Sequence, residues 1–357
     1  MKQPSLKRTI HFKVPTGVLG AALAPDAGTL ACACMDGVYL ADLEAKSADQ
    51  IGTHASYATS AAFLNSQNAV VSAGYDGVVQ WFDIESREQR RRVDLHHFWS
   101  WDMAVSPDET MIASVTGQYL AGGYKYEPQP ETEPSVRIIA ADSGEVLHDL
   151  EHVPSVQAVT FSSTGEYVAA GNLMGEVRVW NTRTRELAAR WTTPDFTSWG
   201  IIKSHCYLGG IFAIRFTPDD RHLLLAGMGP MRDPMAGNGR QLWQKWDWQQ
   251  EQPAKVDETH EGESGEGLME TLSVHPDGQL FVMGGRLRGG DWNVALFDLA
   301  TGDRKAVLKT GYRVTEAMFT ADGTRLVLTG TQGQPRKPED GVFPDFGRIE
   351  VYDLSQS

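Results

Sequence analysis

The sequence contains little cysteine, no long hydrophobic run and none of the short motifs typical of common enzyme classes. Three cysteines, Cys32, Cys34 and Cys206, cannot form an even disulfide framework, so we expect a reducing, cytoplasmic compartment. No apolar run approaches membrane-spanning length, and residues 1–17 lack the apolar core of a signal peptide. The patterns GxSxG and HExxH and the phosphate-binding P-loop do not occur. The sequence therefore does not indicate a secreted disulfide scaffold, a membrane protein or a familiar hydrolase.

Positive charge is also scarce. The chain has 32 Lys and Arg residues against 46 Asp and Glu residues, a formal net charge of −14. An acidic chain gains nothing from counterion release on nucleic acid and is repelled by an anionic membrane surface. We therefore predict neither a nucleic-acid nor a membrane partner. Hydrophobic residues make up 41% of the 357 residues, which is enough for a sizeable core.

What the chain does contain is a recurring unit of three short β-type runs. Residues 155–187 illustrate it, with runs at 156–161, 167–170 and 177–180 and turns that contain Gly165 and Gly175. The apolar residue before the first turn of each unit recurs at spacings of 40 to 58 residues. The aligned residues are Leu23, Phe63, Val105, Phe161, Phe216, Val274 and Phe319. This number and period of strand units suggest the blades of a β-propeller.

Details of the units are similar to those of the WD-repeat propeller family. Several first turns, at residues 106–109, 217–220 and 275–278, are similar to the Ser/Thr-Pro-Asp-Gly turn of that family. A glycine often precedes the third run, and an aromatic–acidic or aromatic–Asn pair ends it. These pairs are Phe82–Asp83, Trp180–Asn181, Trp246–Asp247, Phe297–Asp298 and Tyr352–Asp353. The resemblance covers almost the whole chain. It implies an all-β, seven-bladed propeller of four-stranded antiparallel blades, a single domain over residues 1–357.

The family has a polar network that joins a His, a Ser or Thr, an Asp and a Trp within a repeat. In the second repeat His54, Ser72 and Asp76 stand at matching places, but Phe82 takes the place of the Trp. In the fourth repeat Trp180 is present, whereas Met174 replaces the Asp. The resemblance therefore implies the blade fold without implying a complete network in any repeat.

The last repeat lacks a fourth strand, because the chain ends soon after Asp353. Residues 8–13 alternate like a strand but belong to no repeat of their own. We predict that residues 1–14 provide the closing strand of the last blade, pairing outside residues 348–352. Such pairing closes the ring and leaves few exposed strand edges.

The extra residues of the chain fall in one kind of connection. In a propeller, inter-blade connections and those between second and third strands emerge on one face, which we call the loop face. The long connections are residues 117–134, 193–210, 227–239, 257–267, 285–291 and 330–346. They and the adjoining blade junctions are rich in aromatic residues, Met and Arg, as protein interfaces are. The candidate partner-binding residues are Trp99, Trp101, Tyr124, Trp199, Lys203, His205, Arg232, Arg286, Trp292 and Arg336.

Alternate positions of each first strand should face the central channel, which places Asp102, Arg215 and Glu316 there. We interpret the three as mutual charge compensation, since an unpaired buried charge is costly. Cys32 and Cys34 share a strand face, and only Cys206 and His205 could complete a zinc site. Small core residues are the simpler interpretation of these cysteines. We therefore predict no metal site and no cofactor.

The sequence favours a non-catalytic scaffold or assembly platform that binds protein or peptide partners on the loop face. The chain would then be suited to act as a subunit of a larger complex. One alternative is a metal-assisted hydrolase or isomerase that uses Asp102 and Glu316 at the channel mouth. Another is a sensor that binds a small ligand among Trp99, Trp101 and Trp292.

Overall fold

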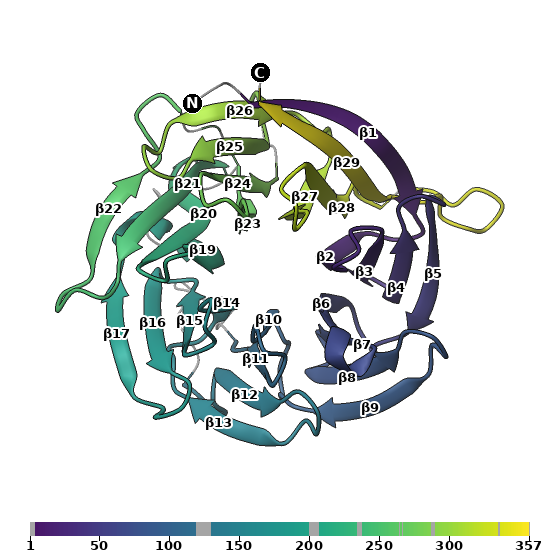
Figure 1. Cartoon of the computed structure of the whole chain (residues 1–357), viewed down its shortest axis with the longest axis horizontal. Coiled ribbons are helices and arrows are strands. Elements are labelled where there is room, and N and C mark those ends of the chain that lie inside the picture. Colours follow the sequence, from purple (N-terminus) through teal and green to yellow (C-terminus); the bar gives the residue numbers. More distant parts are fainter. Residues whose placement is uncertain are drawn as a thin grey trace.

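The computed structural model is a ring of seven β-blades around a central channel (Figure 1). It describes residues 4–118, 130–199, 207–233, 238–263, 265, 267–286, 290–334 and 336–356. Within these ranges the only helices are two 3₁₀ turns, η1 (Asn65–Gln67) and η2 (Pro194–Phe196). No helix of the described chain is long and apolar enough to cross a bilayer. The expected all-β, seven-bladed architecture is confirmed.

Each blade is an antiparallel sheet whose strands follow one another outward from the channel. The first blade comprises β2 (Val18–Leu23), β3 (Thr29–Cys34), β4 (Gly37–Asp42) and β5 (Ser47–Gly52). The second comprises β6 (Ala58–Leu64), β7 (Ala69–Gly74), β8 (Val78–Asp83) and β9 (Gln89–Asp94). The third comprises β10 (Asp102–Val105), β11 (Met111–Val115), β12 (Val136–Ala140) and β13 (Val146–Leu150). The fourth comprises β14 (Val156–Phe161), β15 (Tyr167–Asn172), β16 (Glu176–Asn181) and β17 (Leu187–Thr192).

The remaining blades complete the ring. The fifth comprises β19 (Tyr207–Phe216), β20 (His222–Asp233), β21 (Asn238–Asp247) and β22 (Ala254–Glu258), with a short additional strand, β18 (Thr197–Trp199), beside β19. The sixth comprises β23 (Met269–Val274), β24 (Leu280–Gly285), β25 (Val294–Asp298) and β26 (Arg304–Leu308). The seventh comprises β27 (Arg313–Phe319), β28 (Arg325–Thr331), β29 (Gly347–Gln356) and, outermost, β1 (Pro4–Val14).

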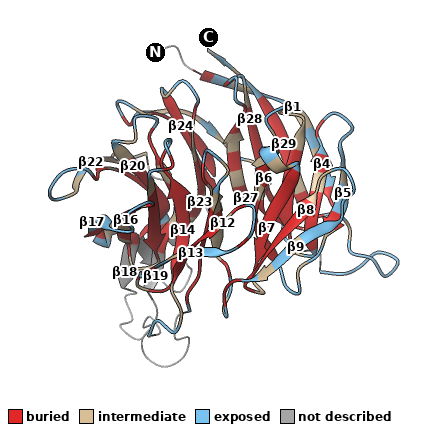
Figure 2. Ribbon diagram, turned by 60° about the horizontal axis from the view of Figure 1, so that its bottom comes forward, coloured by how far each residue is buried: buried red, intermediate tan, exposed pale blue. Residues whose placement is uncertain are grey.

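The hydrophobic core is divided among the spaces between neighbouring blades. The β-branched and aromatic residues of the inner three strands pack there, and each core cluster joins residues of two adjacent blades. The outermost strands consist mostly of exposed and partly buried residues, so the rim of the disc carries more exposed positions than its interior (Figure 2). Burial of apolar surface between blades is the main stabilising term of such a ring.

The N-terminal strand closes the ring as predicted. Strand β1 pairs antiparallel with β29, with Arg8 opposite Tyr352 and Lys13 opposite Arg348. The two ends of the chain therefore meet in one blade (Figure 1). Val14 is fully buried in the cluster between the seventh and first blades. The Arg8 guanidinium also lies 2.7 Å from Glu350 of β29, which links the first and last strands of the chain.

The innermost strands share an irregularity that positions the functional site. In every blade except the third, the pairing of the first and second strands shifts register by one residue near the start of the first strand. The extra residues are Leu19, Thr59, Gln157, Phe212, Glu270 and Thr315. A β-bulge of this kind turns one side chain away from the regular alternation. All six residues line the loop-face mouth of the channel.

Regular structure occupies much of two of the ranges predicted as loops. Residues 193–210 contain η2, β18 and the start of β19, and much of 227–239 is the prolonged hairpin of β20 and β21. Residues 119–129, within the range 117–134, lie outside the described residues. The connection between β28 and β29 projects beyond the edge of the disc (Figure 1), and Val342 and Phe343 are exposed on it.

Candidate functional site

The channel contains two cavities that meet at its middle. The cavity at the loop face has a volume of about 260 Å³, and the one at the opposite face has a volume of about 420 Å³. Four residues belong to both walls, namely Ser60, Asp102, Arg215 and Glu316. The structure therefore brings the three charged residues expected at the channel together at its narrow middle.

Asp102 is held by donors from its own and neighbouring blades. Its Oδ1 accepts a hydrogen bond from the Met103 backbone N–H at 2.8 Å and one from the Ser60 hydroxyl at 3.4 Å. Its Oδ2 accepts one from the Val159 backbone N–H at 3.0 Å. Burial raises the pKa of Asp102 above its usual value, although Arg215 and these donors oppose the rise.

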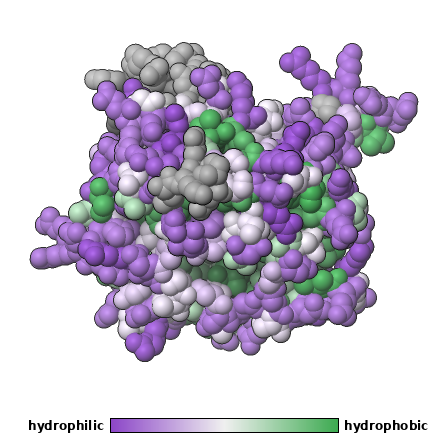
Figure 3. Space-filling model, turned by 45° about the horizontal axis from the view of Figure 1, so that its top comes forward, coloured by the Kyte–Doolittle hydropathy of each residue, from purple (hydrophilic) through white to green (hydrophobic). Residues whose placement is uncertain are grey.

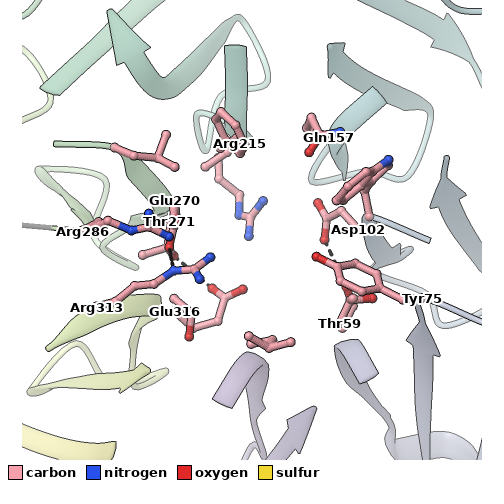
Figure 4. Close-up of a pocket in the computed structure, with 17 residues that line it drawn as sticks. Thr59, Tyr75, Asp102, Gln157, Arg215, Glu270, Thr271, Arg286, Arg313 and Glu316 are labelled. Atoms are coloured by element: carbon pink, nitrogen blue, oxygen red, sulfur yellow. Dashed lines mark hydrogen bonds and ion pairs between the residues drawn. The ribbon is translucent and has the colours of Figure 1, made fainter. Parts of the chain in front are cut away.

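Glu316 has fewer donors in the same environment. Its Oε2 accepts a hydrogen bond from the Thr271 hydroxyl at 3.0 Å. Burial raises the pKa of Glu316 to about 7, with Arg215 opposing the rise and the negative charge of Asp102 adding to it. Glu316 is therefore only partly ionised near neutral pH. Figure 4 shows Arg215 pointing into the space between Glu316 and Asp102.

The rim of the loop-face cavity differs on its two sides. On one side, Arg313 of β27 donates from Nε to Glu270 of β23 at 2.5 Å, and Arg286 follows the end of β24 (Figure 4). On the other side stands Tyr75, which follows β7 of the second blade (Figure 4). Trp101, which precedes β10 of the third blade, lies beside it with ring centres 5.4 Å apart. The mouth thus has a charged side and an aromatic side.

The aromatic side is the edge of a larger cluster on the loop face. Trp99 stacks on Tyr75 with ring centres 4.5 Å apart, and Phe98 stacks on the same indole at 5.1 Å. Trp101 meets both Tyr75 and Trp99 edge-on, and Tyr57 lies 6.0 Å from Tyr75. Trp99 is 40% exposed and Tyr57 is 46% exposed. The face of the molecule visible in Figure 3 is mostly hydrophilic with separate hydrophobic patches.

The other candidate partner-binding residues lie in several environments. Trp292 is only 4% exposed and packs in the core between the fifth and sixth blades, under Arg304, so its ring is not available to a partner. Arg336 is exposed on the connection between β28 and β29. Trp199 belongs to β18 and Arg232 to β20, where the structure describes their backbone only. Tyr124, Lys203 and His205 lie outside the described residues.

Sequence reasoning missed several residues at the mouth, among them Tyr57, Tyr75, Phe98, Glu270 and Arg313. None of them lies in a long connection, and the connection after Tyr75 is short. The available signal was that Tyr57, Tyr75 and Phe98 all lie in inter-blade or second-to-third connections, which share one face. Strand alternation could not place Glu270 at the mouth, because the bulge at this residue interrupts the alternation of β23.

A second polar cluster has the bond pattern of a Ser–His–Asp triad but no access for a substrate. His54 Nε2 lies 2.8 Å from the Ser72 hydroxyl, and His54 Nδ1 lies 2.9 Å from Asp76. Burial opposes the charge of Asp76, but hydrogen bonds from His54, Ala55 and Val78 outweigh it and hold its pKa below the usual value. The side chains of His54 and Ser72 are fully buried. The cluster therefore joins a blade junction to the second blade and has no exposed nucleophile.

Metal-ligating side chains do not gather in the described part of the chain. No group of three or more His, Cys, Asp or Glu residues suited to a metal ion occurs among those ranges. Cys32 and Cys34 are free and buried in the core between the seventh and first blades. Cys206, the third residue considered for a zinc site, lies outside the described residues.

Comparison of the chain with protein-family models gives no match, and comparison with curated proteins gives none either.

Proposed function

We propose that the protein is a non-catalytic interaction platform of the WD-repeat type, which binds a protein or peptide segment across the loop face at the channel mouth. The observation that carries the proposal is the exposed Trp99, stacked between Tyr75 and Phe98 beside an open cavity. Large aromatic side chains with one free edge are typical centres of protein interfaces. The stacking already fixes the indole, so little side-chain entropy is lost when a partner covers it.

The rigid ring is also suited to this role. Tyr75 directly follows β7, Trp101 directly precedes β10, and Arg313 belongs to β27, so separate sheets fix their spacing without a partner. The N-terminal strand β1 is paired with β29 in the seventh blade, whereas the aromatic cluster lies at the second and third blades. A preformed surface of this kind binds with less ordering cost than a mobile loop.

A display library of random peptides, selected against the immobilised full-length chain, tests the proposal. We expect enriched peptides to bind wild-type protein and to bind Trp99→Ala at least about 30-fold more weakly, as for an interface centre worth about 2 kcal/mol. The control is Leu187→Ala, which removes a side chain of similar exposure from the outermost strand of the fourth blade. Failure to enrich any peptide, or equal binding by the Trp99→Ala variant, would contradict the proposal.

One observation favours a second candidate, catalysis at the same cavity. A carboxyl group with a pKa of about 7 in a pocket, as Glu316 has, is suited to general acid–base work. The metal-assisted form of this candidate has no three-residue ligand set within the described ranges. Elemental analysis of the purified protein, together with a panel of ester, amide and glycoside substrates, distinguishes the two. Turnover that disappears in Glu316→Gln would favour the enzyme.

A further inference from the structure

The arginines at the channel mouth have hydrogen-bond donors to spare. Each guanidinium carries five N–H donors. Arg313 uses its side chain on Glu270, and Arg215 Nη1 donates to the backbone carbonyl of Ile214 at 2.7 Å. The Arg286 side chain makes neither a hydrogen bond nor an ion pair with any described residue, and it is exposed at the rim. Most donors of Arg215 and all those of Arg286 therefore have no partner among the described residues, and both side chains line the cavity.

The carboxylates of the wall do not use these donors. Both oxygens of Asp102 accept bonds from Met103, Ser60 and Val159 instead. Across the described chain, no ion pair within 4.0 Å joins Arg215 to Asp102 or to Glu316. Arg215 opposes the rise of the pKa values of Asp102 and Glu316, so it compensates their charge at longer range without a direct ion pair. Apart from the bond of Nη1 to the Ile214 carbonyl, no hydrogen bond or ion pair within the described chain occupies the guanidinium.

We propose that the loop-face cavity binds an acidic side chain, Asp or Glu, of the partner segment, with Arg215 below it and Arg286 at the rim as donors. The inference rests on the proposed function and names the group that the mouth recognises. Arginine is the residue best suited to a carboxylate, because its planar fork can donate two parallel bonds. The aromatic cluster that includes Tyr75 and Trp101 then contacts the residues that flank the acidic one.

The size of the cavity fits one such side chain. Its volume of about 260 Å³ corresponds to roughly nine water molecules at about 30 Å³ each. A glutamate side chain has five heavy atoms, so it enters without displacing the wall. Its carboxylate replaces water at Arg215, where the surrounding protein strengthens the interaction relative to the surface.

The charge of the wall selects a monoanion. Arg215 and Arg286 provide two positive charges, since Arg313 is neutralised by Glu270. Asp102 and a partly ionised Glu316 already offset part of this charge. One carboxylate leaves the net charge of the site close to zero, whereas a phosphate dianion would bring excess negative charge beside two carboxylates. A carboxylate is therefore favoured over a phosphorylated side chain.

Binding should also depend on pH through Glu316. The groups that face Glu316 of β27 are Arg215 of β19, Asp102 of β10 and Glu270 of β23, with Arg286 and Arg313 at the rim. As the pH rises through about 7, Glu316 loses its proton and repels the incoming carboxylate. Affinity should therefore be higher near pH 6 than near pH 8, and Glu316→Gln should remove most of this difference.

The test uses three pools of fluorescein-labelled, N-acetylated and C-amidated pentapeptides. All have random residues on both sides of a central residue, which is Glu, Gln or phosphoserine. Anisotropy titrations with the full-length chain near pH 6.5 should give at least about tenfold tighter binding of the Glu pool than of the Gln pool. Arg215→Gln and, separately, Arg286→Gln should each reduce this preference several-fold. The control, Arg190→Gln, changes an arginine of the outermost strand β17 and should leave the preference intact.

The outcomes separate this inference from the proposed function. If the Glu and Gln pools bind equally and both lose affinity in Trp99→Ala, the acidic-side-chain inference is wrong while the platform remains. Tighter binding of the phosphoserine pool than of the Glu pool would also overturn it. If no pool binds, both proposals are contradicted. Because Arg286 is exposed, the Arg286→Gln variant tests the inference even if Arg215→Gln does not fold.

Discussion

Ring closure can be tested at one buried carboxylate. Glu350 of β29 has a side chain that is only 7% exposed, and it accepts hydrogen bonds from Arg8 at 2.7 Å, Tyr352 at 2.7 Å and Tyr312 at 3.3 Å. Arg8 is the only partner of the three that comes from the N-terminal strand. Replacement of Arg8 by alanine leaves a nearly buried anion with two phenol donors and without its directly bonded cation, although Arg348 still interacts with it at longer range.

The expected size of the effect follows from these contacts. A hydrogen bond between charged groups contributes about 1.5–3 kcal/mol. The Arg8 side chain is 49% exposed, so water recovers part of its solvation and the larger cost of breaking a fully buried pair does not apply. Arg8→Ala should therefore lower the free energy of unfolding by about 1.5–3 kcal/mol. With an m-value of about 3 kcal/mol per M, this lowers the urea midpoint by about 0.5–1 M.

The assay is urea unfolding followed by tryptophan fluorescence, with three comparison variants. Lys7→Ala alters an exposed neighbour in β1 that makes no described side-chain bond, and it should change stability by less than about 0.5 kcal/mol. Glu350→Gln keeps the shape and should cost about 0.5–1.5 kcal/mol, because it converts a charged bond to a neutral one. The double variant of Arg8 and Glu350 should cost less than the sum of its parts.

The reasoning would be refuted if Arg8→Ala and Lys7→Ala were equally stable. Strictly additive effects of Arg8→Ala and Glu350→Gln would refute it as well, because they would mean that the two groups do not interact. Either result would show that backbone pairing and packing of residues such as Val14 close the ring without help from this ion pair.

Two further predictions concern blade stability. The pKa of Asp76 is lower in the folded protein than its usual value. The contribution of the ionised Asp76 to the free energy of unfolding is therefore complete above about pH 4 and is lost as the pH falls through the folded-state pKa. Asp76→Asn should cost about 1.5–3 kcal/mol near pH 7 and progressively less below about pH 4, as measured by urea unfolding at each pH; a constant difference would contradict it. Gly175 has a φ of +76°, and a Cβ there would lie 2.2 Å from the Thr193 carbonyl oxygen. Gly175→Ala should therefore lower the thermal midpoint more than Gly311→Ala, where φ is +79° with open space around it, and equal midpoints would exclude the clash.

Much of the fold could be read from the sequence because its causes are local. Alternation at Val177 and Val179, the turn glycines and the repeated turn sequences specify strands and their order. The closing strand could be predicted because the last repeat lacked a strand and residues 8–13 had no repeat. The polar trio of His54, Ser72 and Asp76 also occupied matching positions, and these three residues do bond to one another.

The candidate site could be predicted only in part. Alternation placed Asp102, Arg215 and Glu316 toward the channel, and the structure puts all three in its walls. Trp292 was grouped with Trp99 and Trp101 because its loop had a similar composition, yet its ring fills the core between two blades. Composition identifies aromatic residues but does not distinguish a ring that faces solvent from one that faces a neighbouring sheet.

By itself the sequence determined the number of units, their strand order and the pairing of the two ends of the chain. Local alternation and turn residues specify the strands, and the one strand missing from the last repeat specifies the partner of the N-terminal segment. Only the tertiary structure decided which side chains meet. The bulges at Glu270 and its counterparts turn residues toward the mouth against the alternation, and Tyr75 stacks on Trp99 because two blades lie side by side. Such contacts depend on backbone register and on the angle between neighbouring sheets, which no single segment specifies.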